Sequence, residues 1–311
     1  MAAKSRDSVE RNASSESRMT YTDFMRLFPD NTACLDYLKA KFYADGTECP
    51  KCGKPSKFHR IKGRSAYSCQ FCAHHVYPTA GTIFHKSTTS LQLWFWAIYL
   101  MSSTRCGLSA KELEREIGVT YKTAHRMFKQ IRTLLSQDDD EPLTGEVEVD
   151  ETAGGGRLRA GDARRGLRAL HADARPTIWG AVERGGRVRA KVVNSRGALD
   201  LEPAVHTHVL PESIIFTDEW KGYRESMSRT YKAHHRIRHQ ERIYVDGNVH
   251  TNTIEGFFGL MKNGIRGVYH SVSAKYLQNY LDEYAWRYNH RFDKRPMFWT
   301  ILDEVSKPEA A

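Results

Sequence analysis

The chain has 311 residues, of which 40% are apolar, so it is long enough to bury one large core or two to three smaller ones. Lysine and arginine number 47 against 37 aspartate and glutamate, and the net charge of +10 favours a polyanionic partner such as nucleic acid. No apolar run reaches the ~18 residues of a membrane span, and the first 18 residues lack a signal-peptide core. We therefore expect a cytoplasmic protein without a membrane partner, whose six cysteines indicate metal binding or free thiols rather than disulfides.

Four of the cysteines form two Cys-x-x-Cys pairs. Cys49 and Cys52 make the first pair, and Cys69 and Cys72 make the second. This spacing is typical of a zinc ribbon, in which four thiolates enclose one structural Zn²⁺ and leave no position open for substrate. Four unrelated cysteines are the alternative.

The remaining cysteines have no partner at metal-binding spacing. Cys34 and Cys106 are predicted to be small buried apolar groups. The nearby histidines are predicted to lie on the surface or to face DNA, rather than to bind the metal: His59, His74, His75 and His85.

A pair of helices is predicted after an apolar, aromatic helix at Leu91 to Met101. Ser109 and Glu112 form a capping box at the start of the first helix, and Gly118 turns the chain into the second. The second helix would present side chains suited to phosphates and base edges: Tyr121, Lys122, His125, Arg126 and Lys129. The pattern predicts a DNA-binding helix-turn-helix; an ordinary helical hairpin is the alternative.

The second half of the chain follows an acidic linker at Gln137–Pro142. The predicted order is a strand, a basic loop, a hairpin around Gly185 and Gly186, a helix, a strand, an irregular segment and a helix. The corresponding ranges are Gly145–Asp150, Ala153–Pro176, Thr177–Val193, Leu199–Leu210, Ser213–Asp218, Tyr231–Gly247 and the helix from Asn252. This order is that of a ribonuclease-H-like fold, a mixed sheet with flanking helices.

Acidic residues stand at the ends of two predicted strands and at the start of a helix. Asp150 and Asp218 end strands that are neighbours in this fold, and Glu255 lies in the first turn of the helix. Mg²⁺, or Mn²⁺ in its place, binds such oxygen ligands, and two such ions can clamp an in-line attack on a phosphodiester. Lys262 leaves the same helix face two turns after Glu255 and is placed to bind a DNA phosphate, with Arg266 as a further DNA contact. A surface ion pair is the ordinary interpretation of the glutamate and the lysine.

Other residues compete for these roles. Glu148 shares a strand face with Asp150, while Glu151 and Glu219 are immediate sequence neighbours of the two aspartates. Asp246 and Asn252 are rivals of Glu255 as the third ligand.

Four segments resemble the zinc-ribbon, DDE-type insertion-sequence transposases of bacteria and archaea. They are Val149–Thr152, Thr217–Tyr223, His250–His270 and Tyr280–Arg291. The resemblance runs from about Thr22 to Arg291. It implies that Asp150, Asp218 and Glu255 bind the catalytic metals and that Lys262 acts with them.

The expected function is DNA transposition. Metal-dependent cleavage at the element's ends would free a 3′-hydroxyl that attacks target DNA, with the protein acting as a homo-oligomer on DNA and associated with the prokaryotic nucleoid. Alternatives are a non-catalytic DNA-binding protein derived from a transposase and a ribonuclease-H-like nuclease that cuts without joining.

The sequence thus predicts a multidomain α/β protein in five parts. These are a disordered tail at 1–20, a helix (Thr22–Lys41) and zinc ribbon within 21–85, a helix-turn-helix at 86–137, a ribonuclease-H-like catalytic domain at 143–295 and a C-terminal tail at 296–311.

Overall fold

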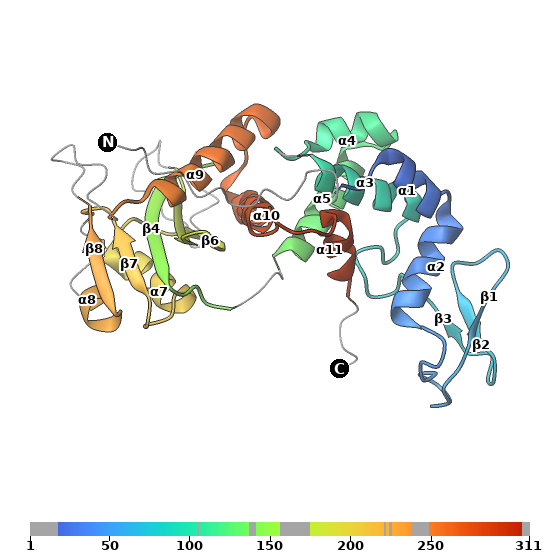
Figure 1. Cartoon of the computed structure of the whole chain (residues 1–311). Coiled ribbons are helices and arrows are strands. Elements are labelled where there is room, and N and C mark those ends of the chain that lie inside the picture. The colour runs from blue at the N-terminus through green and yellow to red at the C-terminus, as the bar shows by residue number, and fades with distance from the viewer. Residues whose placement is uncertain are drawn as a thin grey trace, which may run out of the picture. The chain divides into compact units, whose positions relative to one another are not determined.

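The structure is a computed structural model of the chain, shown in Figure 1. It describes residues 18–104, 106–136, 141–155, 175–220, 222–223, 226–237 and 249–306. Most of the expected N-terminal tail, most of the basic loop and Asp246 lie outside these ranges. The chain divides into two compact units, Met1–Leu134 with Asp293–Ala311, and Leu135–Phe292.

The first unit combines helices with a small three-stranded sheet. Its elements are α1 (Tyr21–Leu27), α2 (Asn31–Phe42), β1 (Phe58–Arg60), β2 (Tyr67–Cys69), β3 (His75–Val76), α3 (Leu91–Ser103), α4 (Ala110–Ile117), α5 (Tyr121–Leu135) and α11 (Met297–Asp303). The core helix predicted at 91–101 is α3, in which Trp94 and Phe95 are fully buried. Aromatic rings hold this unit together, because Phe28 from the end of α1 meets both Phe95 and Phe298 with ring centroids 4.9 and 5.8 Å apart.

Two expectations about this unit were wrong. The single helix at Thr22–Lys41 is two helices, since the chain breaks at Pro29, where Asp30 caps α2 by accepting a hydrogen bond from the Ala33 amide. The expected C-terminal tail contains α11, which packs against α3 and buries Phe298, Ile301 and Leu302. Apolar burial, which a tail lacks, explains this helix.

The predicted helix pair is present as α4 and α5. Ser109 and Glu112 form the capping box reciprocally, and Gly118 ends α4 in the left-handed conformation at φ 68°. Leu113, on α4, and Phe128, on α5, are fully buried. The two helices therefore bury one side of each.

The second unit is built on a five-stranded mixed sheet. Its elements are β4 (Glu146–Ala153), β5 (Thr177–Glu183), β6 (Val188–Val193), α7 (Ala198–His208), β7 (Ile214–Thr217), α8 (Ser226–Thr230), β8 (Ala233–Arg236), α9 (Asn252–Gly264), η2 (Ile265–Tyr269), η3 (Ala274–Tyr276) and α10 (Leu277–Asn289). The strand order is β6-β5-β4-β7-β8, with the first three antiparallel and β7 and β8 parallel to β4. The predicted hairpin is β5 and β6, and the two acid-bearing strands β4 and β7 are neighbours, as expected.

Helices cover both faces of this sheet, and side-chain alternation decides which residues meet them. On one face, Ile178 and Val182 of β5 pack with Phe257, Phe258 and other residues of α9 and α10. On the opposite face, Val147 and Val149 of β4 and Trp179 of β5 pack with residues of α7 and α8. The site residues on β4 are thereby divided between the two layers.

The structure of this unit shows several features that the sequence did not indicate. The segment predicted to be irregular contains β8, a strand with two histidines and an arginine that pairs with β7 through its backbone. Leu260 of α9 is 43% exposed. On α10, Glu283 and Arg287 form a buried ion pair, with Oε1 and Nη2 2.7 Å apart. Within the described ranges, no helix is long and apolar enough to cross a membrane.

Candidate active site and metal-binding clusters

The four paired cysteines converge as predicted. Cys49 Sγ lies 3.7 Å from Cys72 Sγ, and Cys52 Sγ lies 3.9 Å from Cys69 Sγ. Four sulfurs each about 2.3 Å from a tetrahedral zinc would stand about 3.8 Å apart, so the cluster has the dimensions of a Cys₄ zinc site. Ser56 Oγ lies 3.3 Å from Cys69 Sγ, and this contact is the largest influence on Cys69 and lowers its pKa to about 6, whereas the pKa of Cys72 is raised to about 11.

The two halves of the cluster are local turns of the same form. The Gly53 amide donates to the Cys49 carbonyl at 2.9 Å, and the Ala73 amide donates to the Cys69 carbonyl at 3.0 Å. Gly53 and Ala73, each next to the second cysteine of a pair, both adopt positive φ. Cys34 is buried, as expected, but Cys106 is exposed, contrary to expectation.

The sheet register brings the two aspartates to the same level. Glu148 on β4 pairs with Phe216 on β7 in the parallel ladder. Two residues further along each chain are Asp150 and Asp218, so both leave the sheet side by side. Asp150 does not end its strand, because β4 continues to Ala153, but it lies beyond the part of β4 that β7 covers.

A glycine allows α9 to approach the sheet beside Asp150. Gly180 on β5 is the partner of Asp150 in the antiparallel ladder. A Cβ at Gly180 would lie 2.8 Å from Phe258 Cζ and 3.0 Å from Ile254 Cδ1, both on α9. The missing side chain therefore lets the helix that carries Glu255 pack directly against the strand pair.

Three carboxylates form a tight group here. Asp150, Glu151 and Asp218 each place one oxygen within 4.8 Å of the others, whereas Glu255 is outside this group. Burial, followed by the charge of Glu151 and then by those of Asp218 and Glu255, raises the pKa of Asp150 to about 7. Glu255 is thus near enough to act on Asp150 electrostatically. It is exposed and accepts a 2.9 Å hydrogen bond from Thr251 Oγ1.

Glu151 belongs to this carboxylate group, although the sequence indicated it only as the immediate neighbour of Asp150. It is 4% exposed, accepts a 2.9 Å hydrogen bond from Tyr223 Oη, and lies 3.2 Å from Arg196 Nη2. Burial first, and then the charge of Asp218, raises its pKa. The Thr217–Tyr223 motif includes this tyrosine, but its hydrogen bond to Glu151 becomes apparent only in the folded chain.

Basic residues surround the acids on the side of α9. Lys262 Nζ donates to Thr152 Oγ1 on β4, and burial, followed by the charge of Arg266, lowers the pKa of Lys262. A cavity of about 320 Å³ lies beside them and is lined by Ala153, Gly154, Gly155, Arg175, Met261, Lys262, Ile265, Arg266, His270 and Ser271. No acidic side chain is among these residues, so the cavity suits an anion.

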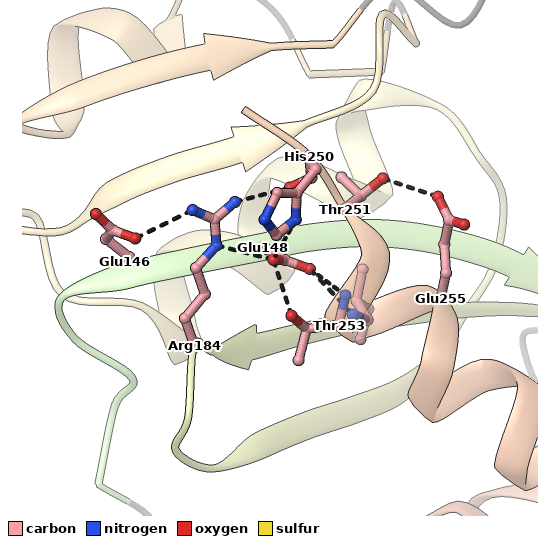
Figure 2. A network of polar contacts seen from close by, with 8 residues as sticks. Glu146, Glu148, Arg184, His250, Thr251, Thr253 and Glu255 are labelled. Carbon is pink, nitrogen blue, oxygen red and sulfur yellow. Dashed lines mark hydrogen bonds and ion pairs between the residues drawn. The ribbon is translucent and has the colours of Figure 1, made fainter. Parts of the chain in front are cut away.

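Glu148, on the same face of β4 as Asp150, is fully buried at the centre of a polar network (Figure 2). It accepts hydrogen bonds from Arg184 Nε at 2.8 Å, from the Thr253 amide and hydroxyl at 2.7 and 2.9 Å, and from the Ile254 amide at 3.1 Å. His250 Nδ1 lies 3.1 Å from its Oε1 but is not aligned as a hydrogen bond. The predicted rival Asn252 is exposed at the first position of α9, and Asp246 lies outside the described residues.

The residues expected to contact DNA lie mainly on the exposed side of α5. Tyr121, Lys122, Arg126 and Lys129 are exposed, and His125 is partly buried with its ring centroid 5.9 Å from that of Tyr121. Burial, followed by the charges of Arg132 and Lys129, lowers the pKa of His125. Arg266 is exposed in η2, a π-helical turn that continues α9.

Comparison with known proteins links these two clusters to one family. Residues 142–289 match the model of the ISXO2-like transposase domain, and residues 29–75 match the transposase zinc-ribbon domain. The first range contains the carboxylate group, and the second contains all four clustered cysteines.

A relative from Halobacterium salinarum is similar to most of the chain. It is described as an uncharacterized protein in transposable element ISH50, and it is 28% identical over 258 residues, which cover 76% of this chain and 84% of the relative. The chain therefore belongs to the prokaryotic insertion-sequence transposases of the zinc-ribbon DDE type.

Proposed function

We propose that the protein is an active DNA transposase that cleaves at the ends of its insertion sequence and joins the freed 3′-hydroxyl to target DNA. The observation that carries the proposal is the convergence of Asp150 and Asp218 from neighbouring parallel strands, with Glu255 on the helix packed over them. The sheet order, with two antiparallel strands on one side of β4 and two parallel strands on the other, supports a ribonuclease-H-like fold.

The donor set of the acid group fits Mg²⁺ or Mn²⁺. Asp150, Asp218 and Glu255 would hold the ions, since hard cations prefer carboxylate oxygens. The burial and mutual repulsion that raise the Asp150 pKa would be offset by a divalent cation. When bound, such ions would favour ionisation of the attacking hydroxyl and stabilise charge on the transferred phosphate.

The remaining residues would orient the acids and the DNA. Tyr223 and Arg196 hold the Glu151 carboxylate by their hydrogen bond and ion pair, which keeps this third charge beside the two aspartates. Lys262 and Arg266 line the basic cavity next to Asp150 and would bind the phosphates that flank the scissile bond. DNA backbone held there would lie against the edge of the acid group.

Recognition of the element ends is assigned to α5. Tyr121, Lys122, His125, Arg126 and Lys129 line one side of a helix whose other side is buried, and this arrangement suits entry into a major groove. The zinc ribbon would contribute a rigid, positively charged surface. Paired cleavage at two ends would require a homo-oligomer on DNA, in association with the nucleoid.

A strand-transfer assay tests the proposal. Purified zinc-loaded protein is incubated with labelled element-end DNA, supercoiled target and Mg²⁺, and the products are separated on a denaturing gel. We expect cleavage with a free 3′-hydroxyl, followed by labelled joint products. Cleavage without joining would indicate a nuclease, and binding without cleavage would indicate a non-catalytic DNA-binding protein.

A further inference from the structure

We infer that Glu148 is a positioning residue for the active site, because its buried carboxylate caps helix α9 from β4 and so holds Glu255 beside Asp150. The inference rests on the proposed role of Glu255 as a metal ligand. Figure 2 shows Glu148 between Arg184, His250 and the first turn of α9, with Glu255 on the same helix.

The first turn of α9 lacks an ordinary cap. A helix begins with backbone amides that have no partner within the helix, and the side chain of the preceding residue usually accepts from one of them. Thr251 occupies that position in α9 and makes no such bond. Glu148, more than a hundred positions earlier in the chain, accepts instead from the amides of Thr253 and Ile254 at 2.7 and 3.1 Å.

Because Glu148 caps α9 in its place, Thr251 is available to contact Glu255. Its hydroxyl donates to Glu255 Oε1 at 2.9 Å, and its side chain is buried. In this rotamer the Thr251 hydroxyl contacts Glu255 and makes no bond to the amides of the first turn. Capping by Glu148 therefore supports both the helix start and the rotamer of the acid one turn later.

The charge of Glu148 is needed for this network. Two backbone amides, the Thr253 hydroxyl and Arg184 all donate hydrogen bonds to the carboxylate. Arg184 also donates to the His250 carbonyl at 2.9 Å and stacks 3.9 Å from the centroid of the Phe216 ring on β7. A glutamine at Glu148 would have nearly the same shape but would turn an amide N–H₂ toward donors.

Two anchor points fix how α9 lies along β4. Glu148 binds the helix at Thr253 and Ile254, and Thr152 accepts from Lys262 two turns after Glu255. Asp150 lies midway between Glu148 and Thr152 on the same strand face, since side chains alternate along a strand. Glu255 falls between the same two anchors on α9, so loss of the Glu148 anchor would release the acid from the metal site.

The experiment measures Mn²⁺ affinity by electron paramagnetic resonance on the full-length, zinc-loaded protein without DNA. The variants are Glu148→Gln, Glu255→Gln and the double variant, and Glu146→Gln is the matched control. Glu146 also pairs with Arg184, at 3.1 Å, but it is the first residue of β4 and 42% of its side chain is exposed. Thr253→Val removes one donor to Glu148 and keeps both backbone amides. Hydrogen exchange over residues 252–256 reports on the cap in every variant.

We expect Glu148→Gln to weaken Mn²⁺ binding by about tenfold or more, as is usual when groups that orient a metal ligand are lost. Exchange in the first turn of α9 should rise, while exchange of β5 and β6 stays low. The double variant should bind no more weakly than Glu255→Gln alone, and Glu146→Gln should bind normally. If Glu148→Gln does not fold, Thr253→Val should still show a smaller weakening of roughly threefold with faster exchange in the same turn.

Normal Mn²⁺ affinity in Glu148→Gln or, where that variant does not fold, in Thr253→Val would overturn the inference while leaving the active site intact. Additive losses in the double variant would also overturn it, because Glu148 would then act independently of Glu255. If Glu255→Gln itself binds Mn²⁺ normally, the proposed third ligand is wrong, and the role of Glu148 through it is refuted together with it. The wild-type and Glu255→Gln measurements thus separate the two failures.

Discussion

The zinc cluster and the carboxylate group are both candidate metal sites, yet they are assembled in opposite ways. The four cysteines lie within residues 49–72, on two short turns closed by their own backbone hydrogen bonds. The carboxylates of Asp150, Glu151 and Asp218 come from β4 and from the residue after β7, and a sheet with helices on both faces brings them together, with Glu255 nearby on α9. The ribbon has little apolar core, so we expect it to need its metal to fold, whereas the sheet unit has a large core and can hold repelling charges before any metal binds.

The largest effect is expected when the zinc ligands are removed. In Cys69→Ser with Cys72→Ser, we expect residues 45–76 to unfold, because structural zinc contributes on the order of 10 kcal/mol to the folding of such modules. The sheet unit should keep its fold. Metal analysis should show about one zinc per wild-type chain, and hydrogen exchange should be measured separately for the two regions.

The exposed Cys106 provides the control for that experiment, since Cys106→Ser should retain zinc. Zinc retained after loss of Cys69 and Cys72, or exchange that rises equally in the β4–β7 region, would contradict the contrast between the two sites.

The second prediction concerns the acids. Asp150→Asn, Asp218→Asn and Glu255→Gln should each lower cleavage and joining by at least about 10³-fold, as expected when one member of a catalytic unit is lost. Each change preserves shape, so DNA binding and fold should be retained. The measurement is the strand-transfer assay beside a gel-shift assay and circular dichroism.

Glu212→Gln, an exposed acid before β7, is the matched control and should cleave normally. If Glu255→Gln cleaves normally while Asn252→Ala or Asp246→Asn does not, the third ligand is misassigned. Normal cleavage by all three acid variants would refute the assignment of these acids as metal ligands.

A smaller effect is expected on stability. Asp150→Asn, which should lower activity, should raise the free energy of unfolding at alkaline pH. The folded-state pKa of Asp150 is about 7, against 3.8 as the ordinary value. The folded protein therefore holds this proton at pH values where the unfolded chain has released it, and the stability from this group is lost as pH rises through 7. Asp150→Asn should match the wild type in stability near pH 4 and exceed it at pH 8 by at most about 4 kcal/mol.

Urea unfolding of the sheet unit, with zinc bound and without Mg²⁺, measures this difference. A wild type as stable as Asp150→Asn at pH 8 would show that neither burial nor repulsion from Glu151 destabilises the ionised Asp150, and would remove the contrast with the ribbon.

The smallest predicted effect concerns DNA recognition by α5. Lys122→Ala with Arg126→Ala should weaken binding to element ends by about tenfold at 0.1 M salt and reduce the salt slope by about 2, because two phosphate contacts release fewer counterions. Fluorescence anisotropy over a salt series gives both values.

Lys111→Ala is the control on α4, where Lys111 pairs with Glu114. An unchanged affinity and slope in the Lys122 and Arg126 variant would move recognition to another surface, such as the zinc ribbon, and would extend the role of that module beyond its own fold.

Features that depend on near neighbours in the chain could be predicted from the sequence alone. The cysteine spacing predicted the cluster, the Ser109 and Glu112 capping box predicted the start of α4, and the glycine pair predicted the β5–β6 hairpin. It also placed acids on two strands that are neighbours in the sheet. These signals are readable because a turn, a cap or a chelating pair is completed within a few residues.

Contacts between distant segments could not be predicted and became apparent only in the tertiary structure. It turned the acid next to Asp150 into a buried partner of Tyr223, and it made Glu148 the cap of α9. It also paired β8, whose charged sequence has no apolar alternation, and formed α11 from an expected tail. The physical reason is that the burial of a charge, or of an edge strand, depends on which donors and apolar surfaces arrive from elsewhere in the chain, and no local pattern records them.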